Sequence, residues 1–182
     1  DDSNEDIGTI HIPISWHTVV EEPTTVKLFM DTYSATCVAD TDQSSKCIEC
    51  LVQLASMRRT LFATDELRMI NISRHMQATV DILQSRRGLE DHANYHHFCR
   101  WLARLKVNYQ LDELIAIDIY PSWIELVAQF TLQSLASDWS WIGDSLFYLL
   151  SLWSRLIAAK PYLKGGKKAY LDDSVVKIVE SY

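Results

Sequence analysis

The sequence predicts an all-α fold, an α-solenoid built of HEAT-like helical hairpins. Apolar residues recur at helical spacing in one segment after another, and we find no sustained alternation typical of strands beyond a short extended piece at Ile10 to Ile14. The helices group in pairs whose second members begin near residues 44, 94 and 144. That spacing is a little longer than the roughly 40 to 47 residues of HEAT and armadillo repeats.

The first predicted pair consists of a helix from Thr24 to Thr36 and a second helix from Ser44 onward. The apolar residues that define the first helix are Val26, Phe29, Met30 and Tyr33; those of the second are Ile48, Leu51, Val52, Ala55 and Phe62. Both sets keep the spacing of one helical face. We therefore expect the first repeat to span about residues 24–62.

The second pair begins at Thr64, which can cap a helix while Asp65 and Glu66 favour its positive start. Its second helix, from Asn94 to Leu114, is amphipathic with an unusually broad apolar arc, to which Trp101 contributes. Such a helix needs neighbours on more than one side. We expect this repeat to span about residues 64–111.

The third pair is expected at about residues 120–160, because Pro121 suits the first turn of a helix and Asp144 can open the next. A further repeat begins near Asp172 and is represented by residues 172–182, while residues 1–22 form an acidic lead-in. Each hairpin leaves an apolar face that only the next can cover. We therefore interpret the whole chain, residues 1–182, as a fragment of one longer solenoid.

Charge and hydropathy exclude several classes of function. The chain has 24 acidic and 17 basic residues, a net charge of −7, and its first 22 residues contain six acids and no Lys or Arg. This balance disfavours nucleic acid as the main partner. The longest nearly uncharged helix, Ser145 to Ala159, contains Arg155 and is shorter than the roughly 20 residues of a membrane span. With no visible signal peptide, we expect a protein of the nucleus and cytoplasm with no membrane contact.

We expect no catalytic, cofactor-binding or metal-binding residues. Two i, i+3 pairs, Cys47 with Cys50 and His96 with Cys99, could supply four zinc ligands, but Cys50 and Cys99 lie beside or within apolar stripes and favour buried thiols. The histidines near residue 96 face no nucleophile on a glycine turn. The stretch KGGKK at 164–168 lacks the spacing of a phosphate-binding loop.

Four blocks resemble the exportin-7 and Ran-binding protein 17 type of karyopherin in the importin-β superfamily. The blocks are IPISW (12–16), CLVQLASMRRTLF (50–62), NYHHFCRWLARLKVNYQLDEL (94–114) and SLFYLLSLWSRLIAAKPYLK (145–164). They occur in register along nearly the whole chain. His97 and Trp101 depart from the pattern, which has Glu and Leu there, and alter the polarity and bulk of the inner face.

The resemblance implies a nuclear transport receptor, an exportin that binds protein cargo cooperatively with Ran-GTP and passes the nuclear pore complex by touching nucleoporins, without enzymatic chemistry. It also implies that the helices beginning near Ser44, Asn94 and Asp144 line the inner, concave layer. The main Ran-contacting repeats of the family precede residue 1. The alternative is a HEAT-repeat scaffold subunit with no Ran dependence, which helix periodicity alone does not separate from a receptor.

The candidate partner contacts are surface groups of these inner helices, namely Arg58, Arg59, Arg100, Trp101, Arg104 and Arg155. Stacked in successive repeats they would form a ladder of donors, for which the planar guanidinium suits carboxylates and aromatic rings. The alternative is that they pair with acids of adjacent repeats and set the superhelical pitch.

Overall fold

The computed structural model describes residues 13–138, 140–163 and 168–182, and within these ranges it is helical without strands. The elements are η2 (Ile14–Trp16), α1 (His17–Glu21), α2 (Pro23–Thr36), α3 (Thr41–Ala55), η3 (Arg59–Leu61), α4 (Asp65–Ser85), α5 (His92–Asn108), α6 (Leu111–Ile115), α7 (Tyr120–Leu135), α8 (Gly143–Ala159), η4 (Lys160–Tyr162) and α9 (Asp172–Ser181). The predicted all-α class is confirmed. The extended piece is not: Ile14 begins a 3-10 helix, and residues 10–12 lie outside the described residues.

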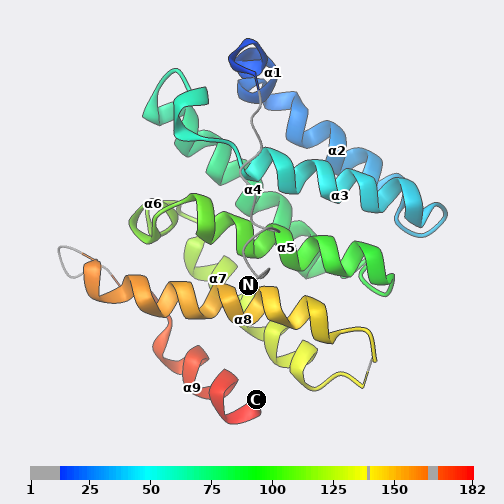
Figure 1. Cartoon of the computed structure of the whole chain (residues 1–182), viewed down its shortest axis with the longest axis vertical. Helices are drawn as coiled ribbons and strands as arrows, with labels where there is room; N and C mark the ends of the chain where they lie inside the picture. Colours follow the sequence, from blue (N-terminus) through cyan, green and yellow to red (C-terminus); the bar gives the residue numbers. More distant parts are fainter. Residues whose placement is uncertain (1–12, 139, 164–167) are drawn as a thin grey trace, which may run out of the picture.

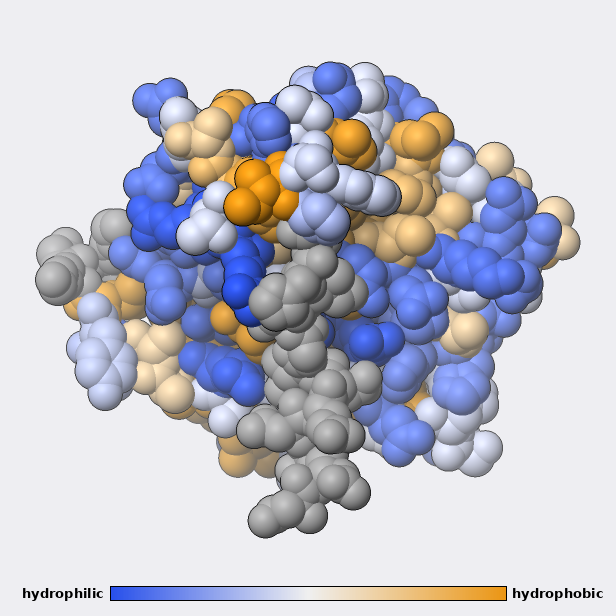
Figure 2. Space-filling view, turned by 45° about the horizontal axis from the view of Figure 1, so that its top comes forward, coloured by the Kyte–Doolittle hydropathy of each residue, from blue (hydrophilic) through white to orange (hydrophobic). Residues whose placement is uncertain are grey.

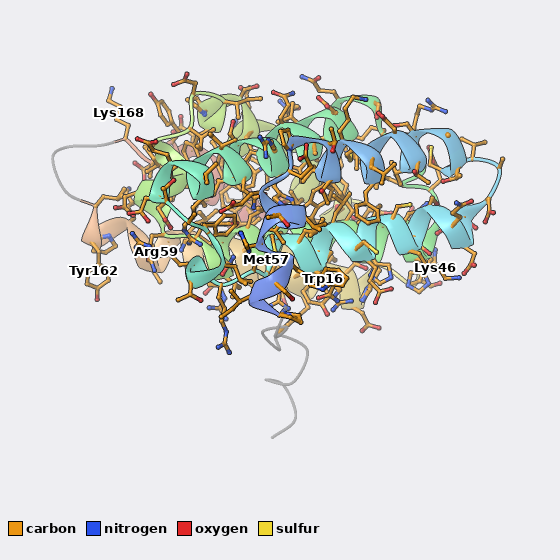
Figure 3. The ribbon with its side chains drawn as sticks, turned by 90° about the horizontal axis from the view of Figure 1, so that it is seen from above. Trp16, Lys46, Met57, Arg59, Tyr162 and Lys168 are labelled. Atoms are coloured by element: carbon orange, nitrogen blue, oxygen red, sulfur yellow. The ribbon has the colours of Figure 1, made fainter. Side chains whose placement is uncertain are left out.

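The longer helices form two layers. In one layer α3, α5 and α8 lie side by side and nearly parallel, as the cyan, green and orange helices of Figure 1 show, and α5 packs against both others. The second layer contains α2, α4, α7 and α9, linked by contacts of α2 with α4, α4 with α7 and α7 with α9. Viewed from above in Figure 3, α2 and α4 form one row and α3 belongs to the other. This stacking is that of a HEAT-like solenoid.

Local signals fixed most helix starts as predicted. The Thr64 hydroxyl accepts a hydrogen bond from the Leu67 amide at the start of α4, and Pro121 occupies the first turn of α7. Helix α9 begins at Asp172, as expected. Helix α3 begins three residues before Ser44, at Thr41, because the Asp40 carboxylate accepts a hydrogen bond from the Gln43 amide and caps it. The division into repeats stays a prediction.

The prediction of one continuous helix from Asn94 to Leu114 is wrong, because the helix is interrupted at Tyr109 and Gln110. Helix α5 ends at Asn108, Tyr109 is extended (φ −118°, ψ 141°), and α6 starts after it. Gln110 and Glu113 form a capping box that opens α6. The Asn108 side-chain amide donates hydrogen bonds to the carbonyl oxygens of Ala55 and Met57, at 2.9 and 2.7 Å. These bonds satisfy the end of α3 and place the break.

Phe62 does not continue the stripe of α3, contrary to the prediction. The helix ends at Ala55, and Phe62 follows η3 in extended conformation. Its side chain packs in a small separate cluster with Val20, Met57 and Leu61. Helix α1 is thereby anchored to the α3–α4 connection, where the Glu21 carboxylate also accepts a hydrogen bond from the Ala63 amide at 2.7 Å.

Gly88 permits the tight approach between α2 and the turn before α5. Its φ of +80° lies in the left-handed region, and an added Cβ would stand 2.7 Å from both Cys37 Cβ and the Tyr33 hydroxyl oxygen. The Tyr33 hydroxyl donates to the Arg87 carbonyl at 2.6 Å, and the Asn94 amide donates to the Gly88 carbonyl at 3.1 Å. The turn is therefore held from both layers.

A tryptophan–histidine pair joins α5 to α4. The Trp101 indole N–H donates to His75 Nδ1 at 3.2 Å, and both side chains are completely buried. Because Nδ1 accepts this bond, the proton of the neutral ring is on Nε2, which is buried and has no hydrogen-bond partner among the described residues. Burial lowers the pKa of His75 to about 3, and the positive charge of Arg74 adds to the effect. The imidazole is neutral in the folded protein.

We predict that Leu102→Ala lowers the free energy of unfolding by about 2 to 5 kcal/mol, because Leu102 is fully buried on α5 and truncation leaves a cavity. Urea denaturation of the chain measures the change. Val107→Ala on the same helix is the matched control, since Val107 is 36% exposed and its truncation removes little packing. An unchanged midpoint for Leu102→Ala would contradict the position of α5 between its neighbours.

We predict that acid destabilises the fold through His75. The unfolded chain binds a proton there below about pH 6.5, whereas the folded chain does so only near pH 3. Stability is therefore lost as pH falls, by about 2 kcal/mol between pH 7 and pH 5. His75→Gln keeps an acceptor for Trp101 and removes the titration, so its urea midpoint should depend less on pH. Parallel pH profiles for the two proteins would exclude this role of His75.

Candidate partner-binding surface

A small groove runs between α5 and α8 on the face of their layer that points away from the second layer. We call it the α5–α8 strip and define it by the residues that line it, Arg100, Ala103, Arg104, Val107, Phe147, Tyr148 and Ser151. The first four come from α5 and the others from α8. The two helices pack directly on each other, so this pairing is fixed by the core beneath it.

The strip combines positive charge with exposed apolar groups. Arg100 is half-buried and Arg104 is 9% exposed, while the Phe147 ring is 57% exposed. Arg100 and Arg104 are one helical turn apart and so belong to the same side of α5. The combination of an arginine pair with an exposed aromatic ring is typical of protein-binding surfaces.

The charge of these two helices differs from that of the chain. Helices α5 and α8 carry the bases Arg100, Arg104, Lys106 and Arg155 and the single acid Asp144, in a chain whose net charge is −7. Burial lowers the pKa of Lys106, and the nearby positive charge of Arg155 lowers it further, against the opposing pull of Asp112 and Glu113. The positive charge of Arg155 on α8 therefore repels the ammonium group of Lys106 on α5.

Aromatic and imidazole rings continue the surface toward the N-terminal ends of α5 and α8. The His92 ring lies 4.8 Å from Trp141, and the His96 ring lies 5.4 Å from Tyr148, which is a lining residue of the strip. His96 Nδ1 is 3.2 Å from the Ser145 hydroxyl oxygen. His97 Nδ1 is 3.4 Å from Arg100 Nη1, so Arg100 has a polar contact with a residue of its own helix, α5.

The structure brings together only part of the predicted arginine ladder. Arg100 and Arg104 line the strip, and Arg155 is exposed on α8. Arg58 and Arg59 are exposed beyond the end of α3 and do not line it; Figure 3 shows Arg59 at the end of the molecule opposite Lys46. Arg59 forms a two-point ion pair with Asp65, at 3.0 and 2.6 Å. The pairing alternative therefore holds for Arg59, whose acid lies at the start of the next predicted repeat.

The prediction that Trp101 is a surface contact is wrong. Its side chain is fully buried and faces α4, because the indole N–H finds its acceptor, His75, on that helix. Sequence reasoning also missed Val107, Phe147 and Tyr148 as surface groups. The available signal was the apolar composition of α8, which extends around more of the helix than a single packed face requires.

Other apolar side chains are exposed at the two ends of the stack. Figure 2 shows hydrophobic groups near the top of its view. Among the N-terminal elements, Val19 on α1, Leu28 on α2 and Val38 after α2 are exposed. At the opposite end, a groove between α8 and α9 is lined by Leu150, Ile157, Val175 and Val179, among others. Both surfaces lie where an adjacent repeat packs in a solenoid.

In the described part of the chain, no three His, Cys, Asp or Glu side chains are grouped so that they could hold a metal ion. Cys99 is fully buried, and burial raises the pKa of its thiol well above the ordinary value. Burial also raises the pKa of Cys47 and Cys50. Residues 164–167 of the KGGKK stretch lie outside the described residues. Among the described helices, none has both the length and the hydropathy to span a bilayer.

Comparison with known proteins places this arrangement in a family. The chain is 40% identical over all 182 residues to Ran-binding protein 16 of Drosophila melanogaster and to Ran-binding protein 17 of Homo sapiens, and spans 16% of each. It is 33% identical over 182 residues to exportin-7 of Dictyostelium discoideum, of which it spans 17%. No family model matches the sequence. The chain belongs, as a segment of about one sixth of their length, to the family of exportin-7 and Ran-binding protein 17.

Proposed function

We propose that this chain is part of a nuclear transport receptor, an exportin that carries protein cargo together with Ran-GTP through the nuclear pore complex. The observation that carries the proposal is similarity over the whole chain to proteins named for Ran binding and for export. The receptor would move between nucleus and cytoplasm and touch nucleoporins on the way. Its mechanism would be binding alone, without a catalytic step.

The solenoid is suited to this function. A stack of hairpins has a nearly one-dimensional core, so the layer of α3, α5 and α8 can present a long surface while small changes at each helix contact alter its curvature. We assign this layer to the concave side, where cargo and Ran-GTP would be enclosed. The exposed apolar groups at the ends of the stack support continuation of the array in a longer receptor.

Within this function, Arg58, Arg100, Arg104 and Arg155 are the candidate partner contacts. Trp101 would act indirectly, by fixing α5 against α4. Arg59 would serve mainly to hold the start of α4 through Asp65. The alternative function is a scaffold subunit without Ran dependence, and the experiment must distinguish it from a transport receptor.

We predict that the full-length protein binds Ran loaded with GTP at least tenfold more tightly than Ran loaded with GDP, a difference of about 1.4 kcal/mol or more. Titration with each nucleotide form measures it, in the presence and absence of cargo. Deleting residues 13–182 should reduce the preference, because cargo and Ran-GTP would no longer share one arch. Circular dichroism must show that the shortened protein stays helical. Equal affinity for the two nucleotide forms would contradict the transport-receptor proposal and favour a scaffold subunit without Ran dependence.

A further inference from the structure

We propose that the α5–α8 strip binds an acidic segment of a partner protein, with carboxylates on Arg100 and Arg104 and an apolar side chain against Val107 and Phe147. The inference deepens the proposed function, on which it rests, by naming the chemistry of one partner. It is carried by two bases that line the groove, Arg100 and Arg104, beside the exposed Phe147, in a chain whose net charge is −7.

The geometry of the two arginines selects carboxylates. They are one turn apart on α5, about 6 Å between Cβ atoms, a separation that acidic residues of an extended or helical segment can match. A guanidinium group accepts a carboxylate in two-point geometry, which fixes orientation as well as charge. Arg104 is 9% exposed and lines the groove, so a carboxylate that reaches it leaves much of its water behind and interacts more strongly than at an open surface.

The apolar part of the strip adds specificity for protein. Phe147 is 57% exposed and Val107 36% exposed, beside the arginines. A polyanion without apolar groups would leave these side chains in water, whereas an acidic segment with one large apolar residue covers them. Removing such a side chain from water stabilises the complex. The strip therefore favours a mixed acidic and apolar sequence.

Other occupants fit less well. Nucleic acid would be repelled by the acidic surface around the strip, since the whole chain has a net charge of −7. A second copy joined by a twofold axis through the strip would place Arg100 and Arg104 opposite the same arginines. The acids Asp1, Asp2, Glu5 and Asp6 of this chain offer the same chemistry as a partner segment, so the experiment has to separate the two sources.

The test uses the full-length protein and a fluorescent short peptide with Glu pairs around one Phe. Its counterpart carries Gln in place of every Glu. We expect the Glu peptide to bind about tenfold more tightly, with an affinity that falls as salt rises, because charge pairs are screened. Arg100→Gln with Arg104→Gln should weaken binding of the Glu peptide about tenfold and leave that of the Gln peptide nearly unchanged.

Two further variants keep the result interpretable. Because Arg104 is largely buried, Phe147→Ser tests the apolar half of the strip at an exposed position, and we expect about threefold weaker binding of both peptides. Lys27→Gln with Lys46→Gln removes the same charge on α2 and α3, where both lysines are exposed in i, i+4 ion pairs. This control should change affinity less than twofold, and melting temperatures identify any variant that fails to fold.

Several outcomes would overturn the proposal. If the double lysine variant weakened peptide binding as much as the double arginine variant, the loss would come from net charge and not from the strip. If the Glu and Gln peptides bound with equal affinity, Arg100 and Arg104 would have no role in binding carboxylates. If replacing Asp1, Asp2, Glu5 and Asp6 with Asn or Gln raised peptide affinity tenfold or more, the occupant would be the chain's own acidic segment. Ran-GTP binding, measured on the same samples, distinguishes these failures from failure of the proposed function.

Discussion

The burial of α5 on three sides is the constraint on which the rest of the structure depends. Helices α3 and α8 cover its two flanks, and the second layer covers its back through the contacts of Trp101 with His75 and of Tyr95 with Phe130. Only one stripe of α5 remains for solvent or a partner. The core itself therefore decides which residues of this helix can have a binding role, and the arginines of the α5–α8 strip occupy that stripe.

Polar side chains fix how the helices are placed relative to one another. Asn108 satisfies two carbonyl groups at the end of α3, and the Trp123 and Trp153 indoles donate to Thr79 and Thr131, each 3.0 Å away on another helix. Arg68 is buried in an ion pair with Glu113, which joins α4 to the start of α6. Apolar packing alone would tolerate sliding of parallel helices, whereas a buried donor costs energy unless its acceptor is aligned. These bonds select one alignment of the stack.

The sequence was sufficient to predict the features that depend only on residues close to each other in the chain. The cap at Thr64, the first-turn Pro121 and the start at Asp172 are local, and the structure has each of them. The break at Tyr109 was not predicted, because its causes include the carbonyl groups at the end of α3 and the pair of Arg68 with Glu113, more than forty positions away. The same reason explains Trp101, whose orientation is set by an acceptor on α4. Among the predicted arginines, the sequence could not distinguish those grouped on the strip from Arg59, paired with Asp65.

A local group of positive charges on an otherwise acidic solenoid affects which partner segments can bind. Arg100, Arg104 and Arg155 lie on neighbouring helices, whereas the chain as a whole has an excess of acids. At physiological salt, charges more than about 8 Å apart are largely screened, so an acidic segment is attracted only when it is already close to the strip and is repelled by the surfaces around it. Repulsion elsewhere contributes to specificity as much as attraction at the site. Since opening or closing the array changes which repeats surround the strip, the curvature of the solenoid would tune the binding of such a segment without any change in the strip itself.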